Sequence, residues 1–454
     1  MSLDHADVAA LRQHFSGTLV TAHHPEYEQS RRVWNAMIDR YPGVVARCRT
    51  VADVVVAVNW AREHKVPIAV RGGGHNVAGK ATCDGGIVID FSEMKAVTVN
   101  PEKRTALAEP GARWTDFDIA TQAHGLATTG GTVGDTGIAG LTLGGGFGWL
   151  GGRHGMTVDN LIGADLVLAN GQTVHASASE NPDLFWAIRG GGGNFGVVTA
   201  FEYQLHPIGP MVVGGLVMHP IERARDVLRF YRDLTATAPD DLTVAAVLLT
   251  GPNGHKLCAM AAAYVGSVED GERAVAPIKA FGPPVLDVLG PIPYLGLQAL
   301  LEAAMPAHVL NYWKADFVPA LSDGLIDAAI DIYSRVVSPQ SSILLYPIHG
   351  AATRVARTAT AYPHRSGIHM GIYALWTDAS LNAQNIAWVR AAWEQIQPFV
   401  PGGVYVNELG EDEGDDRVSL AYGENFVRLT QIKAKYDPEN LFALNANIRP
   451  AVTA

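Results

Sequence analysis

The chain has 454 residues, of which 48% are hydrophobic and 17% charged, a balance that excludes a largely disordered chain and leaves room for two or three domains. Its 34 lysines and arginines against 45 aspartates and glutamates give a net charge of −11, which disfavours binding to nucleic acid or to anionic membranes. Cys48, Cys83 and Cys258 are widely spaced, and we find neither a secretory signal nor ~18 consecutive apolar residues, so we expect a cytoplasmic protein with reduced thiols and no membrane-spanning helix.

The first predicted elements form a strand–helix–strand unit. Residues 44–46 are predicted as a strand, and Thr50 with Asp53 three residues later is a capping box that begins a helix. Residues 67–70 form the next strand and run directly into residues 71–76, a loop that contains three consecutive glycines. Such a loop at the end of a strand presents backbone N–H groups to a pyrophosphate.

Three further features follow before residue 210. Residues 85–90 and 103–108 each contain a predicted strand. Residues 130–155 are dense in glycine and almost uncharged, so we expect neither an ordinary helix nor a solvated linker, but a backbone that closely approaches something. Residues 182–188 are predicted as a helix, followed by a glycine cluster at 190–196 and a strand at 197–205. The glycine-rich character fades near residue 207, where we place a domain boundary.

The second half mixes strands and helices. In residues 367–376, His369 and Tyr373 share one face with Gly371, whereas the other face is apolar and suits packing under helices. Near the end we predict a strand at 404–407, a helix at 425–436 that stops at an Asp-Pro pair, and a short segment at 441–448. The acidic residues at 411–416 are interpreted as a solvated loop.

Several motifs leave alternatives open. Two segments, 146–151 and 191–196, match G-x-G-x-x-G, but neither follows a strand and opens a helix, so a nicotinamide-binding fold is a weak second hypothesis. His75 follows the glycine turn, where it either caps the turn, which local sequence favours, or binds or attacks a cofactor. His349, His364 and His369 do not have metal-ligand spacing, and we expect no metal site.

Tyr405 and Asn407 alternate with two valines, which on a strand would place both polar side chains on one face. One interpretation is an edge strand facing solvent. The other is a catalytic tyrosine, but a phenol with a pKa of ~10 acts as a base only beside a positive centre or an electron-poor ring. Strand alternation would place Glu408 on the opposite face.

Taken together and in this order, these motifs resemble those of the berberine bridge enzyme-like FAD-linked oxidases. The resemblance rests on residues 71–76, 85–90, 137–148, 153–160, 183–196, 405–407 and 436–447. It implies an α+β fold, with a two-part FAD-binding domain of the vanillyl-alcohol-oxidase or PCMH type and a substrate domain in which helices cover an antiparallel sheet. The expected boundaries are an N-terminal helical segment at 1–37, the FAD domain at 38–209, the substrate domain at 210–400, and a segment at 401–454 that returns to the FAD domain.

The resemblance also implies site residues. His75 matches the histidine that is joined to the 8α-methyl carbon of the flavin, whereas Val133 and Leu141 replace the cysteine and histidine associated with a second link, so one covalent bond is expected. The cofactor-binding residues that it implies are Arg71, Gly72, Gly73, Gly74, His75, Asn76, Gly79, Thr136, Gly137, Ala139, Gly140, Asn160, Val197, Tyr405, Asn407, Asn445 and Asn447. Expected substrate contacts are His369, Tyr373, Trp313 and Tyr346.

The expected reaction is removal of a hydride from a substrate C–H bond by FAD while Tyr405, or alternatively Glu408, takes a proton. Dioxygen then reoxidises the flavin and forms hydrogen peroxide, and Thr136 stands at the position that controls oxygen access in relatives. A sugar, alcohol, amine or other natural product suits the aromatic residues of the second domain about equally. The remaining alternatives are an NAD(P)-dependent dehydrogenase and a flavin-binding protein without turnover. We expect a monomer or homodimer.

Overall fold

The predicted strand–helix–strand unit is present in the computed structural model, which describes residues 5–451. It consists of β2 (Val44–Arg47), α3 (Val51–His64) and β3 (Ile68–Arg71), and the Thr50–Asp53 capping box begins the helix as predicted. These strands pair in parallel with β4 (Ile87–Asp90) in the order β2-β4-β3. The N-terminal segment, expected to be helical, contains two short helices and also a strand, β1 (Thr18–Val20), which pairs antiparallel with β2.

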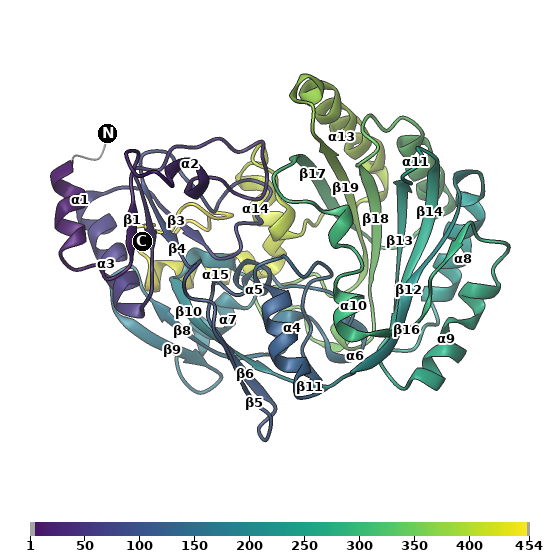
Figure 1. The fold of residues 1–454 in the computed structure, drawn as a ribbon, viewed down its shortest axis with the longest axis horizontal. Coiled ribbons are helices and arrows are strands. Elements are labelled where there is room, and N and C mark those ends of the chain that lie inside the picture. The colour runs from purple at the N-terminus through teal and green to yellow at the C-terminus, as the bar shows by residue number, and fades with distance from the viewer. Residues whose placement is uncertain (1–4, 452–454) are drawn as a thin grey trace.

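A second, antiparallel sheet completes the first lobe, which comprises residues 5–210 and 401–451 (Figure 1). Its order is β5-β6-β10-β8-β9, with β5 (Val97–Asn100), β6 (Thr105–Ala108), β10 (Val197–Gln204), β8 (Leu161–Val167) and β9 (Thr173–Ser177). The helices α4 (Trp114–Gln122) and α7 (Pro182–Ile188) share its hydrophobic core. The edge-to-face contacts of Tyr203 with Trp114 and Phe117 join α4 to the sheet.

The second lobe, residues 211–400, is built on an eight-stranded antiparallel sheet. Its strands are β12 (Met211–Pro220), β13 (Leu242–Thr250), β14 (Lys256–Tyr264), β15 (Leu286–Asp287), β16 (Gly290–Pro293), β17 (Leu310–Val318), β18 (Ser342–Ile348) and β19 (Gly367–Trp376). Four helices cover one face: α8 (Ala224–Thr235), α9 (Val268–Ala280), α11 (Asp323–Ser334) and α13 (Asn382–Ile396) (Figure 1). The predicted α+β architecture is therefore confirmed.

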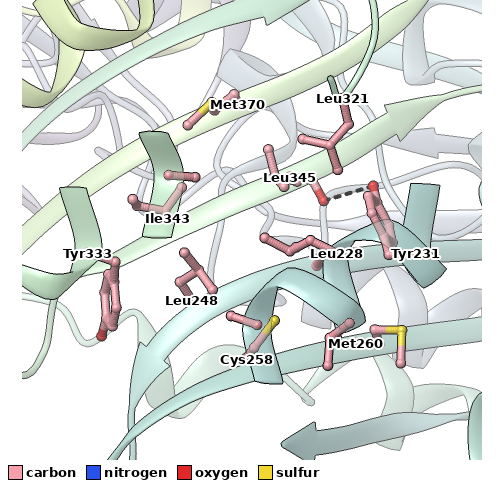
Figure 2. Close-up of a cluster of buried hydrophobic side chains, with 14 of the residues drawn as sticks. Leu228, Tyr231, Leu248, Cys258, Met260, Leu321, Tyr333, Ile343, Leu345 and Met370 are labelled. Atoms are coloured by element: carbon pink, nitrogen blue, oxygen red, sulfur yellow. Dashed lines mark hydrogen bonds between the residues drawn. The ribbon is translucent and has the colours of Figure 1, made fainter. Parts of the chain in front are cut away.

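The hydrophobic core under those helices accounts for the alternation of apolar and polar side chains along β19. Met370 and Ile372 point into it beside Leu345, whereas His369 and Tyr373 lie on the face toward the first lobe, as the alternation predicts. Figure 2 shows this core, in which the hydroxyl of Tyr231 from α8 donates to the carbonyl of Leu345 at 3.3 Å. Because helices fill one face, the other is left for the first lobe and for any ligand.

The remaining elements are short. They are α1 (His5–Arg12), α2 (Tyr27–Ser30), β7 (Leu126–Ala127), α5 (Ile138–Leu143), α6 (Gly151–His154), β11 (His206–Pro207), α10 (Tyr294–Gln298), α12 (Ala351–Arg354), α14 (Asp415–Tyr422) and α15 (Phe426–Tyr436). Two of them, α5 and α6, lie inside the glycine-rich region, which therefore contains more helix than we expected. Ile138 and Leu143 of α5 are buried, so their packing outweighs the low helix propensity of Gly140 inside the helix. No described helix is both long and apolar enough to cross a membrane.

The chain's end returns to the first lobe, where the yellow helices α14 and α15 lie with the purple and blue elements (Figure 1). Lys433, fully buried in α15, donates to Asp437 at 2.6 Å and to the carbonyl of Asn194 at 2.7 Å. Its ammonium also lies 3.4 Å from the carbonyl of Phe442. One buried cation thus ties the C-terminal segment to the glycine cluster at 190–196.

The acidic residues at 411–416 are not a purely solvated loop, contrary to expectation. Asp412 accepts hydrogen bonds from Tyr312 at 2.6 Å, Arg390 at 2.9 Å and Lys314 at 3.1 Å. Burial raises the pKa of Asp412, but these donors together lower it to about 2. Because donors from β17 and α13 are distant in sequence, the run of acids alone could not reveal this tie.

Asp118 supplies a pH-dependent test of the fold. Gln298 donates to its Oδ2 at 2.8 Å and also to the carbonyl of Gly131, so the group supports the glycine-rich wall. Burial raises the pKa of Asp118 to about 7, although the Gln298 hydrogen bond opposes the rise. Between about pH 4 and 7, Asp118 therefore binds a proton in the folded chain but not in the unfolded chain. As the pH rises through this window, the contribution of Asp118 to the free energy of unfolding falls by up to about 4 kcal/mol.

We expect Asp118→Asn to remove this loss, because the amide oxygen still accepts from Gln298 and carries no charge. Denaturant unfolding from pH 4 to 8 should show the variant gaining stability over the wild type as pH rises. The exposed Asp226→Asn is the control and should show no such gain. A constant difference between Asp118→Asn and the wild type across this range would contradict the assignment.

Candidate active site

A cavity of about 860 Å³ lies between the first lobe and the open face of the eight-stranded sheet. Its volume is typical of small-molecule and cofactor sites. The first lobe contributes the glycine loop around Gly72–Gly74, the glycine-rich wall near Gly137 and the cluster near Gly193. The C-terminal segment contributes residues 405–408 and Asn445.

The glycine loop and the glycine-rich wall pass each other backbone to backbone. A Cβ built on Gly73 would lie 2.5 Å from the nitrogen of Gly137, and one built on Gly137 would lie 2.4 Å from the nitrogen of Gly73. Gly74 has a φ of +70°, which favours glycine. A Cβ at Gly140 would meet nothing within 4 Å, so this exposed glycine borders open cavity. Walls of bare backbone fit a cofactor that is bound by close approach of N–H groups.

His75 lies where this loop meets the cavity. Its ring stacks on Trp34, with centroids 4.6 Å apart and planes at 23°. Its Nε2 lies 3.4 Å from Oδ2 of Asp135, which also forms an ion pair with Arg113. The hydrogen bond with His75 and the charge of Arg113 hold the pKa of Asp135 below its usual value. The imidazole is thus oriented by the side chains of Trp34 and Asp135.

The wall residues that the sequence analysis missed include Trp34 and Lys80. Trp34 lines the cavity, and its backbone N–H donates to the carbonyl of Gly74 at 3.1 Å, but no local pattern links it to a loop 40 residues later. Lys80 also lines the cavity, and burial, followed by the charge of Arg40, lowers its pKa. A lysine just after a glycine loop was an available signal for an anion-binding group.

Residues 404–407 do not form a strand, contrary to prediction. Gly402 and Gly403 have φ angles of +99° and +148°, and Val406–Glu408 is a 3-10 helix. Because a tight turn replaces the alternation, Glu408 lines the cavity together with Tyr405 instead of facing away from it. Four residues of alternating character are too few to distinguish a strand from such a turn.

The hydroxyl oxygen of Tyr405 is fixed by two donors. The amide of Asn407 donates to it at 2.8 Å and the backbone N–H of Gly146 donates at 3.2 Å. Burial raises the pKa of Tyr405 far above its ordinary value, although both donors oppose this. The tyrosine is therefore a neutral phenol at physiological pH, with its own hydrogen available for donation.

The carboxylate of Glu408 is hydrogen-bonded to side chains on the polar face of β19. The hydroxyl of Tyr373 lies 3.1 Å from both carboxylate oxygens, and Nε2 of His369 lies 3.1 Å from Oε2. Burial, followed by the charge of Glu408, raises the pKa of Tyr373 well above its ordinary value, so this phenol remains a donor. The result is an oriented carboxylate at the cavity wall.

Most residues expected at the site line this cavity. They are Gly72, Gly73, Gly74, His75, Asn76, Thr136, Gly137, Ala139, Gly140, Val197, Trp313, Tyr373, Tyr405, Asn407, Glu408 and Asn445. His369 contacts the cavity only through Glu408.

Besides His369, five expected residues lie outside the cavity wall, and four of them have clear structural partners. Arg71 forms a buried ion pair with Asp90, and Gly79 packs against Ile38. Asn160 donates to the carbonyls of His154 and Met156, and Tyr346 donates to the carbonyl of Gly148. The fifth, Asn447, has a buried side-chain oxygen without a hydrogen-bond partner in the structure.

Comparison with known proteins identifies the family. Residues 42–177 match the family described as FAD binding domain, and residues 404–449 match the family described as berberine and berberine like. An FAD-linked oxidoreductase of Dictyostelium discoideum is 32% identical over 94% of this chain and 93% of its own length. The (R)-6-hydroxynicotine oxidase of Paenarthrobacter nicotinovorans is 28% identical over 93% of this chain and 94% of its own length.

Solved structures give the same result. The 6-hydroxy-D-nicotine oxidase from Arthrobacter nicotinovorans has a TM-score of 0.89 and 26% identity, over 96% of this chain and 98% of its own. A chitooligosaccharide oxidase has a TM-score of 0.88 and 25% identity, over 98% and 100%. The chain therefore belongs to the berberine bridge enzyme-like family, and it is an FAD-linked oxidoreductase.

Proposed function

We propose that the chain is an oxidase that carries one FAD, joined covalently to His75, and passes electrons from a small organic substrate to dioxygen with formation of hydrogen peroxide. The observation that carries this proposal is the position of His75, which stands between the glycine loop and Trp34 with its ring oriented toward Asp135. Val133 and Leu141 line the same cavity, so a second covalent link has no nucleophile at either position.

The cavity wall has residues whose chemistry suits the pyrophosphate, the flavin ring and the adenosine of FAD. The N–H groups of the glycine loop and the ammonium of Lys80 suit a pyrophosphate, because both favour anions. Thr136, Gly137 and Gly140 provide a side-chain-poor wall for a flat ring, with Asn445 nearby on the C-terminal segment. Val197 would border the adenosine.

Bound FAD would accept the hydride from the substrate and return the electrons to dioxygen. The chain's part is to orient the substrate and move its proton. Glu408 accepts the proton from the substrate O–H or N–H, while Tyr373 and His369 hold its carboxylate in place. Tyr405 remains a neutral donor, because ionising even an unperturbed tyrosine at pH 7 costs about 4 kcal/mol and burial adds to that cost. The cost of ionising Tyr405 therefore favours Glu408 as the base.

A peroxide-release screen over sugars, amines and phenolic alcohols tests the proposed activity. We expect at least one class to give peroxide with a matching consumption of dioxygen. A colourless purified protein that binds NAD would overturn the proposal in favour of a dehydrogenase. A yellow protein that no compound reduces would instead support the flavin-binding protein without turnover.

Thr136 is the proposed position of oxygen access. We expect Thr136→Leu to slow reoxidation of the reduced flavin, because the larger side chain occupies space at the wall, without changing flavin content. The holoenzyme is reduced anaerobically, mixed with aerated buffer and followed by flavin absorbance, with the exposed Thr98→Leu as the control. Equal reoxidation rates in both variants would remove Thr136 from this role.

A further inference from the structure

The open face of the eight-stranded sheet has two parts. One part packs on the first lobe, where Ala263 shares a hydrophobic cluster with Trp149 and Leu150. The other part lines the cavity and is formed by Leu216, Met218, Val247, Leu249, Ala259 and Leu344. Their strand neighbours, such as Val217 and Leu248, lie in the opposite core, so the alternation of each strand assigns these six side chains to the cavity.

A second apolar segment completes this part of the cavity. Leu300, Leu301 and the stretch from Ala303 to Pro306 line it as well. We call the space bordered by this segment and the six sheet residues the apolar chamber. The polar wall residues Thr250, Gln340 and Ser342 lie at or beyond the ends of β13 and β18, so they belong to the rim.

Charge is scarce along these walls. Among the described residues that line the cavity, Lys80 and Glu408 are the only lysine, arginine, aspartate or glutamate. Lys80 lies beside the glycine loop, because its backbone N–H donates to the side-chain oxygen of Asn76 at 3.2 Å. Glu408 is therefore the single charged group available to a molecule in the apolar chamber.

Given the proposed oxidase activity, we infer that the substrate is a largely apolar molecule with one amine or hydroxyl group that donates a hydrogen bond to Glu408, and not an oligosaccharide. The hydroxyl groups of a sugar would lose water against aliphatic side chains without gaining partners. An aromatic or alicyclic body instead gains from leaving water, and its single donor is paired. The nearby ring of Trp313, tilted against Tyr373 with centroids 4.7 Å apart, adds to the apolar surface.

Binding to the holoenzyme tests this inference with four probes: 4-phenylbutylamine, 4-phenylbutan-1-ol, the methyl ether of that alcohol, and cellobiose. Affinities are measured anaerobically by calorimetry and by perturbation of the flavin absorbance. We expect the amine and the alcohol to bind, the ether to bind about tenfold more weakly, and cellobiose not to bind. Leu249→Gln should weaken the phenyl probes by about tenfold or more, whereas the surface variant Leu286→Gln should leave them unchanged. The near-isosteric Val247→Thr provides a second, milder polar change to the wall.

Cellobiose binding as tightly as the alcohol, or no calorimetric binding of any probe, would overturn the inferred substrate class. Unchanged affinity in both wall variants would show that the apolar chamber is not where the probes bind, and would overturn it too. Failure of the oxidase proposal is recognised separately, because the protein would then lack flavin or would not return electrons to dioxygen, while calorimetry would still report on the chamber.

Discussion

Replacing His75 by alanine is expected to abolish acid-stable flavin attachment while the protein still folds. The glycine loop, Lys80 and the glycine-rich wall remain to hold FAD without a covalent bond, so the purified variant should be yellow before acid precipitation and colourless after it. The measurement is flavin absorbance of the washed, acid-precipitated protein, together with circular dichroism of the untreated variant.

His175→Ala provides the matched control for this experiment. Its ring pairs with Asp165 at 2.8 Å on β8 and β9, away from the cavity wall, so this variant should keep its acid-stable colour. If the His75→Ala pellet stays as yellow as the wild type, another residue forms the link and the assignment of His75 is wrong.

Glu408→Gln is expected to lower the limiting rate of flavin reduction by about 10²–10⁴-fold, the range for loss of a general base. Glutamine keeps the shape and can still accept from Tyr373, but it cannot take the substrate's proton. Stopped-flow reduction under anaerobic conditions, with a substrate found by the peroxide screen, separates this rate from binding. We expect a smaller loss for Tyr405→Phe, because a neutral phenol orients the substrate but does not remove its proton.

Glu411→Gln is the control, since Glu411 pairs with Arg40 and does not line the cavity. It should reduce at the wild-type rate. A larger loss in Tyr405→Phe than in Glu408→Gln would return the role of base to the tyrosine, as the resemblance first implied.

The sequence predicted the fold well where the signals are local. The Thr50–Asp53 capping box begins α3, and the alternation of residues 367–376 assigns each face of β19 correctly. The three glycines after β3 line the cavity because a close backbone approach, at Gly73 against Gly137, needs residues without side chains. The capping box and the strand alternation are short-range rules of geometry, and they do not depend on the rest of the chain.

The site could be predicted only in part, because tertiary contacts decide the rest. Trp34 reaches His75 from a distant loop, and Asp412 finds its donors on β17 and α13. Arg71 is the first residue of the glycine-loop motif, yet its side chain pairs with Asp90 and does not line the cavity. Motif position locates a loop, but neighbours that are remote in sequence determine which of its side chains face the ligand.

The central claim, that His75 carries the flavin, is tested most directly by mass spectrometry of the purified wild-type chain. After proteolysis, the account predicts one flavin-bearing peptide, which contains residues 71–76, and fragmentation that places the added mass on His75. An intact mass equal to that of the bare polypeptide, or a flavin found on any other residue, would contradict it.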